Sequence, residues 1–375
     1  MTLGMRVREA RELRGLTQAQ LSDRVAGLGH QVDRSYIAHL EADRNIAGAE
    51  LLTAIADAMD LPTDFFTDSY DTEFPEGTLL FRARSDMTAR QEAQARAWGK
   101  VMFERIIQLS SQLRVPPVTI PRLQGIDPED AAHHARAALG LSPDRPIGHV
   151  LNAIERGGVI VISVPMQMER RDAYSVWAGD PLRPVIVLMD GAPGDRLRFS
   201  AAHELGHLVL HSARPTRMPV IEAEANRFAS EFLLPTGSML EDLVPPVTLT
   251  SLAPLKRKWG VAIQTLVRKA RTIGAINENQ YTYLFQQIGR RGWRTRESEA
   301  LDVPIEKPRA FRRMVEVLYG DPVDYRHLAR ELRLRPHEMR QVVEAFASKS
   351  DLPKRGNVGE PRVIAFPKPS LVKDE

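Results

Sequence analysis

The chain has 375 residues, 43% of them hydrophobic and 26% charged, which is ordinary for a folded protein of two or three domains. It contains no cysteine, which excludes disulfides and cysteine-bound zinc, so any metal ligands must come from His, Asp and Glu. No stretch approaches the ~18 uninterrupted apolar residues of a membrane span, and the charged N-terminus lacks the apolar core of a signal peptide. We therefore expect a cytoplasmic protein without a membrane partner.

Charge is distributed unevenly along the chain. Residues 1–67 hold seven Arg against ten Asp and Glu, whereas residues 290–375 hold nineteen Lys and Arg against fourteen acidic residues. The acidic balance of the first segment counts against non-specific DNA affinity, because that affinity comes from neutralised phosphates.

Residues 4–67 read as a run of short helices. The apolar stripe of the first helix ends at Gly15, and Thr17 with Gln20 forms a capping-box pattern for a second helix over 18–25. Asp33 or Ser35 can cap a third helix that runs through residue 41, and a fourth helix ends before Pro62. This pattern predicts a small helical domain.

The rest of the chain changes from helical to strand periodicity and back. A linker and a long helix are expected over 68–124, followed by short helices up to residue 156. The β-branched runs at 159–162 and 185–188, with 174–177 between them, predict a small sheet. Helices are then expected in the order 196–210, 220–233, 249–288 and 323–346.

The predicted fold class is therefore multidomain, mainly α with α+β parts. A five-helix bundle occupies 1–67, an α+β domain 125–290 and a helical region 291–347. The Pro- and Lys-rich tail, 348–375, is expected to be disordered.

The helix expected over 196–210 contains a short metal-binding motif. His203 and His207 are four residues apart, so their imidazoles converge on one helix face, as two neutral nitrogen ligands of zinc require. Glu204 lies beside the metal rather than on it, where it can act as a general base. Gly206 has low helix propensity, which suggests a close approach by a neighbouring element. The pattern predicts a Zn²⁺ peptidase site.

A catalytic zinc needs a third protein ligand. Glu222 is the better candidate, because Asn226 lies four residues further on the same face and can hydrogen-bond a ligand histidine; Glu224 is the rival. His211 reads more readily as a helix-end residue than as a ligand partner. Tyr174 and Arg198 are candidates for stabilising an oxyanion.

These segments resemble a known family. The sequence from Arg198 to His211, with Glu222 to Ala229 and the residues up to Pro235, is similar to the ImmA/IrrE zinc metallopeptidases over about residues 125–270. The resemblance implies His203, His207 and Glu222 as ligands and Glu204 as general base. It also implies cleavage of a DNA-binding repressor as the activity.

The first 67 residues resemble the phage-repressor (XRE-type) helix-turn-helix family through Leu16–Ser22 and Tyr36–Arg44. They depart from it in a long turn over 26–32 and in Ala42-Asp43, where a Gly is usual. By analogy, base edges would meet side chains at the start of the third helix, and phosphate would meet Gln18. The expected base-facing residues are Arg34, Ser35, Tyr36 and His39. A basic side is expected from Arg6, Arg8, Arg11, Arg14, Arg34 and Arg44. The competing interpretation is a five-helix protein-interaction module.

Three functions fit these motifs. The first is a transcription regulator that binds operator DNA and cleaves a partner, either a repressor or a toxin–antitoxin component. The second is a non-proteolytic repressor or antitoxin whose zincin fold serves sensing or dimerisation. The third is a zinc sensor. The intact Glu204 favours the first, and a second copy of the chain is a candidate partner.

Overall fold

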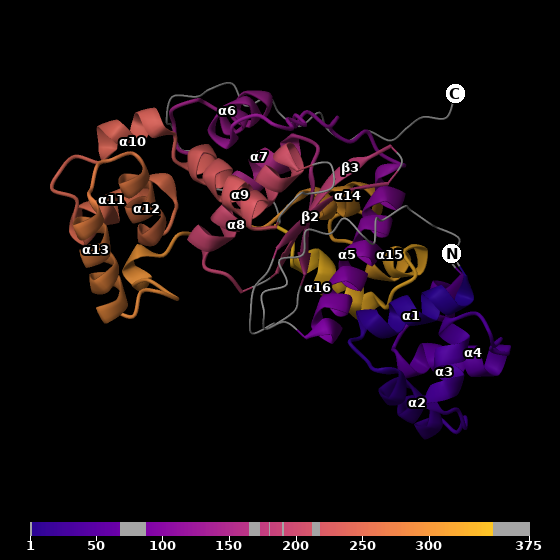
Figure 1. Ribbon diagram of the computed structural model, residues 1–375. Helices are drawn as coiled ribbons and strands as arrows, with labels where there is room; N and C mark the ends of the chain where they lie inside the picture. The colour runs from indigo at the N-terminus through magenta and orange to yellow at the C-terminus, as the bar shows by residue number, and fades with distance from the viewer. Residues whose placement is uncertain are drawn as a thin grey trace. The chain divides into compact units, whose positions relative to one another are not determined.

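The computed structural model describes residues 2–67, 88–164, 173–179, 181–189, 191–211 and 218–347. Most of the predicted linker and the whole predicted tail lie outside these residues. The chain divides into two compact units. We call residues 1–74, 82–115 and 309–375 the terminal unit, and residues 75–81 and 116–308 the central unit. The predicted C-terminal region, 291–347, is thus shared between the units (Figure 1).

The terminal unit is all helical in its described part. Its helices are α1 (Leu3–Leu13), α2 (Gln18–Gly27), α3 (Arg34–Glu41), α4 (Ala49–Ala58), the 3-10 helix η1 (Thr63–Thr67), α5 (Ala89–Ser110), α14 (Ala310–Tyr319), α15 (Tyr325–Glu331) and α16 (Pro336–Glu344). The first four α-helices and η1 make up the predicted five-helix bundle. The predicted capping box of α2 is present, and the side chain that caps α3 is Asp33 rather than Ser35.

Helix α14 lies within the predicted helical region 291–347 but was not predicted as a separate element. Its residue before the first turn is Arg309, which provides no side-chain cap, so the usual start signal is missing. The apolar face of α14 packs on α5, which also packs along α1. The interior of the terminal unit is therefore built from both ends of the chain.

The central unit contains the one sheet found among the described residues. Its strands are β1 (Ile160–Val164), β2 (Tyr174–Ala178) and β3 (Arg183–Met189), in the order β1-β3-β2. Strand β1 is parallel to β3, with Ile160 opposite Val185, and β2 is antiparallel to β3, with Tyr174 opposite Val187. The three predicted strand segments are confirmed.

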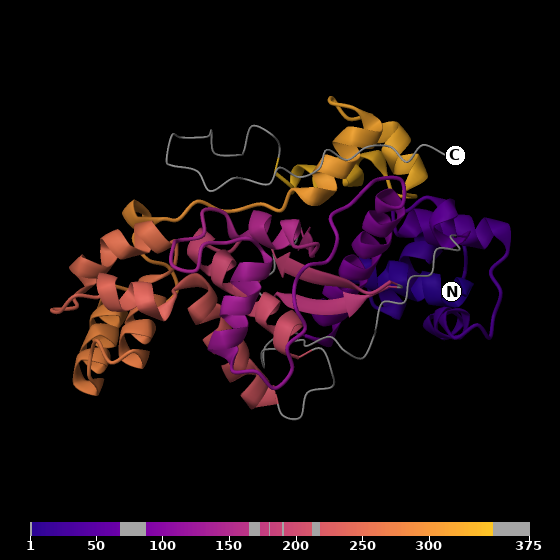
Figure 2. The same cartoon turned by 90° about the horizontal axis from the view of Figure 1, so that it is seen from above.

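Nine helical segments complete the described part of the central unit. They are α6 (Pro128–Ala138), α7 (Val150–Arg156), α8 (Gly194–Leu210), α9 (Met218–Leu233), α10 (Thr236–Asp242), α11 (Leu249–Trp259), α12 (Ile263–Thr272), α13 (Glu278–Arg290) and η2 (Glu299–Leu301). Helices α11 to α13 pack consecutively, and Figure 2 shows them as an orange cluster.

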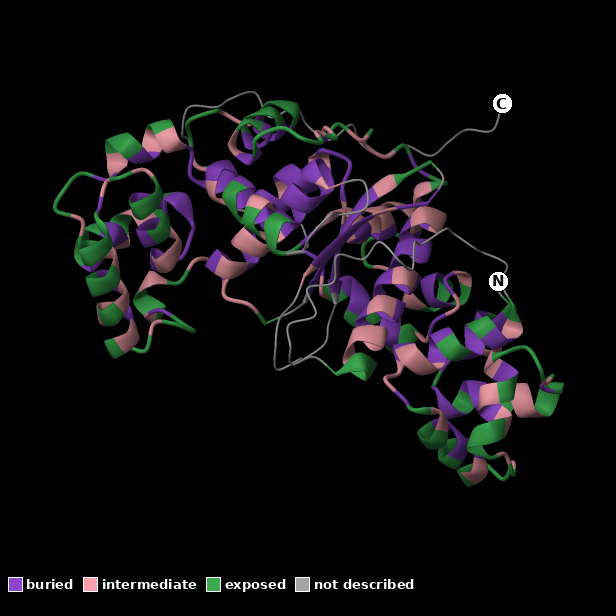
Figure 3. Ribbon diagram, in the orientation of Figure 1, coloured by how far each residue is buried: buried purple, intermediate pink, exposed green. Residues whose placement is uncertain are grey.

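Helix α8 lies at the centre of this unit. It packs on β2 and β3 on one side and on α6, α7 and α9 on the others. Nearly every residue of α8 is buried (Figure 3). A helix enclosed in this way can hold polar side chains away from water, which matters because burial strengthens electrostatic interactions. No helix in the described part of the chain is long and apolar enough to cross a membrane.

Candidate metal centre and nucleic-acid interface

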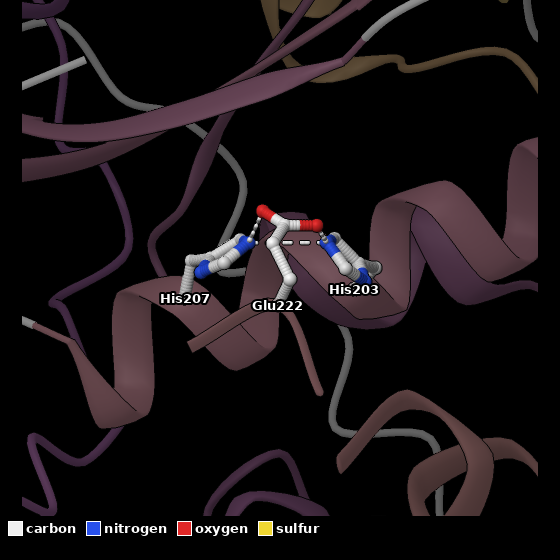
Figure 4. A group of neighbouring side chains, drawn as sticks. All are labelled: His203, His207 and Glu222. Atoms are coloured by element: carbon white, nitrogen blue, oxygen red, sulfur yellow. Dashed lines mark hydrogen bonds and ion pairs between the residues drawn. The ribbon is translucent and has the colours of Figure 1, made fainter. Parts of the chain in front are cut away.

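Helix α8 brings two histidines together, because their four-residue spacing puts both on the same face. The Nε2 atoms of His203 and His207 are 3.0 Å apart, and both side chains are buried. Figure 4 shows the two rings rising from one helix toward a carboxylate that comes from elsewhere. The expected convergence of the imidazoles is present in the structure.

The carboxylate is that of Glu222, on α9. Its Oε2 lies 3.5 Å from Nε2 of His203 and its Oε1 lies 3.4 Å from Nε2 of His207. Burial raises the pKa of Glu222, but the two histidines, when they are protonated, outweigh that effect and hold its pKa well below the ordinary value. Glu222 is therefore an anion whose oxygens face both rings (Figure 4).

Asn226 orients the first histidine. Its side-chain nitrogen donates a hydrogen bond to the carbonyl of Glu222 at 2.7 Å, so its Oδ1 faces Nδ1 of His203 at 3.2 Å. An amide oxygen can only accept, so His203 carries a proton on Nδ1, and its neutral form, the form that binds a metal, presents a lone pair at Nε2. That lone pair faces the anionic Glu222 and His207.

The donor set therefore fits a cation. His203, His207 and Glu222 are the group of metal-ligating side chains found among the described residues, with ligand atoms within 4.8 Å of one another. Converging lone pairs repel unless a positive charge lies between them. Two imidazole nitrogens and one carboxylate are the three-protein-ligand pattern of catalytic zinc.

Glu204 lies one residue beyond His203 and is held by a strand. Ser175 on β2 donates from its Oγ to Oε2 of Glu204 at 2.7 Å, and both side chains are buried. Burial raises the pKa of Glu204, and the neighbouring histidines oppose that shift only in part. A buried carboxyl with a raised pKa is a stronger base than an exposed one and can take up and release a proton during a reaction.

The helix-end histidine takes part in the same cluster. His211 is the C-cap residue of α8, and its Nδ1 lies 3.0 Å from Nδ1 of His207. Its Nε2 lies 2.8 Å from Oε2 of Glu224. Burial lowers the pKa of His211, and Glu224 opposes this effect. Glu224, the rival ligand, thus binds His211.

The predicted nucleic-acid face lies on α2 and α3 in the terminal unit. Arg34, Ser35 and His39 are exposed on α3, as residues that meet DNA must be. Tyr36 is half-buried, and its hydroxyl donates to the carbonyl of Ile46 at 3.1 Å. Gln18, expected at a phosphate, donates to Oε2 of Glu41 at 2.9 Å.

Comparison with protein families matches two stretches of the chain. Residues 154–271 match the family model of the IrrE N-terminal-like domain, a peptidase family, and residues 7–66 match a helix-turn-helix model. The chain is a fusion of these two domains. No curated protein matches it.

The predicted basic side of the helix-turn-helix domain is largely neutralised by carboxylates of the terminal unit. Arg6 is buried between Glu9 and Glu104. The guanidinium of Arg11 binds both oxygens of Glu41, at 2.5 and 3.0 Å, and Arg14 binds Glu338 on α16 at 2.6 Å. The expectation that these three arginines form an open basic side is wrong, because their charges hold the helices together. Arg34 and Arg44 remain exposed beside α3.

The two departures from the helix-turn-helix pattern have local explanations. Asp43 has a φ of 56°, the left-handed conformation for which Gly is usual. Its carboxylate accepts from the backbone of Gly4 at 3.0 Å and from the hydroxyl of Thr2 at 2.5 Å, which offsets the strain. The long turn includes Gly29 at a φ of 93°. Both features leave α2 and α3 packed on each other.

A cavity of about 550 Å³ lies beside the start of α2 in the same unit. Its lining includes Gln18 and Arg34 together with Ala89, Arg90 and Ala93 of α5. The first turn of α5 therefore adjoins the predicted nucleic-acid face.

Two sequence predictions about the IrrE-like domain are wrong. Arg198 does not face the histidines: its guanidinium binds Glu306 and donates to the carbonyl of Ile147 at 2.6 Å. Tyr174 alternates with Ser175 along β2, so it lies on the strand face that points away from Glu204. Neither can stabilise an oxyanion at this site.

The predicted close approach at Gly206 is confirmed. A Cβ atom at this position would lie 2.9 Å from the ring of Phe228 on α9. Helices α8 and α9 therefore pack closely where the histidines and Glu222 meet. Ser175 could not be found from the sequence, because a serine in a five-residue strand carries no signal of which helix it faces.

Proposed function

We propose that the chain is a DNA-binding transcription regulator whose IrrE-like domain is a zinc-dependent endopeptidase. Its substrate is a partner regulatory protein, either a repressor or a component of a toxin–antitoxin pair. The helix-turn-helix match supports DNA-binding regulation, and the IrrE-like match supports a peptidase-like domain that uses a metal.

One observation carries the enzymatic part of this proposal. Buried His203 and His207 and half-buried Glu222 stand beside a buried Glu204 that a strand hydroxyl holds in place. A site that only stabilised the fold would need the three ligands but would gain nothing from a buried carboxyl next to them, since burying that group costs free energy.

The residues have separate roles in the proposed reaction. His203, His207 and Glu222 would hold zinc, which, when bound, supplies Lewis-acid chemistry that activates water and polarises a peptide carbonyl. Ser175 occupies Oε2 of Glu204 and leaves Oε1 to take a proton from the attacking water. Glu204 then delivers that proton to the nitrogen of the leaving amine.

The DNA-binding part rests on the exposed side chains of α3. Arg34, Ser35 and His39 would face base edges in the major groove. Tyr36, which is half-buried, would pack against the sugar-phosphate backbone of the DNA. Gln18 would approach a phosphate at the start of α2, where the helix dipole favours negative charge.

The peptidase proposal is tested with the Glu204→Gln variant. Cells that produce either the wild-type chain or this variant are compared by mass spectrometry of protein N-termini. We expect one or a few new N-termini that appear only with the wild-type chain, while both proteins hold equal zinc. Identical N-termini from two zinc-loaded proteins would instead favour the non-proteolytic repressor or antitoxin.

The DNA proposal is tested with a labelled duplex taken from upstream of the coding sequence. Fluorescence anisotropy is measured between 50 and 200 mM salt. We expect affinity to fall steeply with salt, because bound phosphates release counterions. Affinity that does not change with salt, or with Arg34→Ala, contradicts this part.

A further inference from the structure

We propose that His211 and Glu224 are positioning residues that act through His207 and set the affinity of the site for zinc. The inference rests on the proposed function, because it assumes that His203, His207 and Glu222 bind the metal. It assigns a role to two residues that neither the motif nor the ligand set includes.

When His211 is neutral, the hydrogen-bond chain from Glu224 through His211 to His207 has one consistent direction. An ionised carboxylate can only accept, so Nε2 of His211, at 2.8 Å from Glu224, must carry a proton. A neutral His211 then has a lone pair at Nδ1, which faces Nδ1 of His207 at 3.0 Å. His207 must therefore donate from Nδ1, and its own lone pair is left at Nε2. That is the atom that faces His203 and Glu222.

The reverse direction is unfavourable. If His211 donated to His207, its Nε2 would present a lone pair to the carboxylate of Glu224, and two acceptors would face each other. His207 would then carry its proton on Nε2, inside the ligand cluster, where it would block a metal. Glu224 thus selects the tautomer of His207 through two successive hydrogen bonds.

Different hydrogen-bond partners hold the two ligand histidines in the same tautomer, with the proton on Nδ1. His203 donates to the neutral amide of Asn226, whereas His207 donates to an imidazole backed by a carboxylate. The negative charge on Glu224 makes Nδ1 of His211 a stronger acceptor, which in turn strengthens His207 as a metal ligand. We therefore assign His207 the larger dependence on its supporting residues.

Burial and exposure agree with a supporting role. The side chain of His207 is 2% exposed and that of His211 is 7% exposed. Glu224, at the other end of this series of hydrogen bonds, is 38% exposed. Glu224 therefore stays in contact with water, while the hydrogen bonds that it controls are sheltered from water. This placement also makes Glu224 a position that can be changed without disturbing the core.

The test is zinc binding by the full-length apo protein, with zinc sulfate as the only added ligand and a fluorescent chelator as competitor. The variants are Glu224→Gln and His211→Ala, singly and together. Glu241→Gln, an exposed acidic residue on α10, is the control. We expect each single variant to bind zinc about 10- to 100-fold more weakly, as loss of a supporting hydrogen bond typically causes. The double variant should be no weaker than His211→Ala alone, because Glu224 acts only through His211.

A second measurement separates positioning from simple structural support. Hydrogen exchange of α8 and α9 in the apo protein should be unchanged in Glu224→Gln. Faster exchange that accounts for the weaker zinc binding overturns the positioning role. Zinc affinity equal to that of the wild type in both single variants also overturns it, and leaves the proposed function intact. A wild-type chain that binds no zinc overturns both.

Discussion

The metal centre and the predicted nucleic-acid face use charge in opposite ways. At the metal centre, the nitrogen and oxygen atoms of His203, His207 and Glu222 that can bind a metal converge on one another. In the helix-turn-helix domain, Arg6, Arg11 and Arg14 are each matched by a carboxylate of the same unit. Converging metal-binding atoms therefore mark where a ligand is expected, and paired charges mark where the fold is held together.

The largest effect that would sharpen this comparison is expected at Arg11. Arg11→Ala leaves Glu41 without its bidentate partner at the junction of α1 and α3, which should cost on the order of 3 kcal/mol of local stability. The loss of local stability is measured by hydrogen exchange of the amides of α1 to α3. Arg8→Ala is the matched control: it removes an exposed pair with Glu12 and should cost less than ~1 kcal/mol. Equal effects of the two variants contradict the distinction.

A pH experiment tests the buried cluster between α1 and α5. Burial, with the charge of Glu9, raises the pKa of Glu104 from 4.5 to about 7 despite Arg6 and Arg105. The folded state then holds a proton that the unfolded state releases, so stability falls as pH rises from about 4.5 to about 7 and is level above. The change amounts to at most about 3 kcal/mol. Glu104→Gln should flatten this slope, and an unchanged slope would show that Glu104 does not cause it.

The close packing of α8 on α9 gives the next prediction. Gly206→Ala puts a methyl group 2.9 Å from the ring of Phe228, which should destabilise the central unit by about 1–3 kcal/mol. Zinc binding should weaken as well, because a shift of α9 away from α8 would move Glu222 away from the histidines. Gly237→Ala, with open space around its Cβ position, is the control. A Gly206→Ala protein with wild-type stability and zinc affinity would show that α8 and α9 can accommodate a methyl group at this contact.

The exposed face of α3 should show a smaller effect, confined to DNA. Arg34→Ala should weaken binding to the upstream duplex by about 1–3 kcal/mol if the side chain reads a base. Arg290→Ala removes one exposed charge from the central unit and controls for net charge. Equal losses of affinity for upstream and random duplexes would assign Arg34 to the phosphate backbone instead.

The metal centre was predictable from the sequence to the extent that it depends on helical spacing. His203, His207, Glu222 and Asn226 were identified because residues four apart share a face whatever the rest of the fold does. Ser175 and the His211–Glu224 pair were missed, because their roles depend on which elements pack against α8. Tertiary packing is not encoded in local spacing.

The same limit applies to the fold. The three strand segments and most helices follow local patterns of hydrophobicity and capping. Those patterns could not predict that the first 67 residues pack with α5 and with α14 to α16. Arg14 and Glu338 are 324 positions apart, and no local signal links them. The arginines of the helix-turn-helix domain were misread for that reason.

Zinc content tests the central claim most directly. The wild-type chain and its Glu222→Gln and Glu204→Gln variants are purified, dialysed against zinc and then against buffer, and analysed for metal. We expect one zinc per chain in the wild type and in Glu204→Gln, because Glu204 is a base and not a ligand. Glu222→Gln should lose most of its zinc, because a neutral amide replaces the only anionic ligand. A wild-type chain without zinc, or a Glu222→Gln chain that retains it fully, contradicts the account.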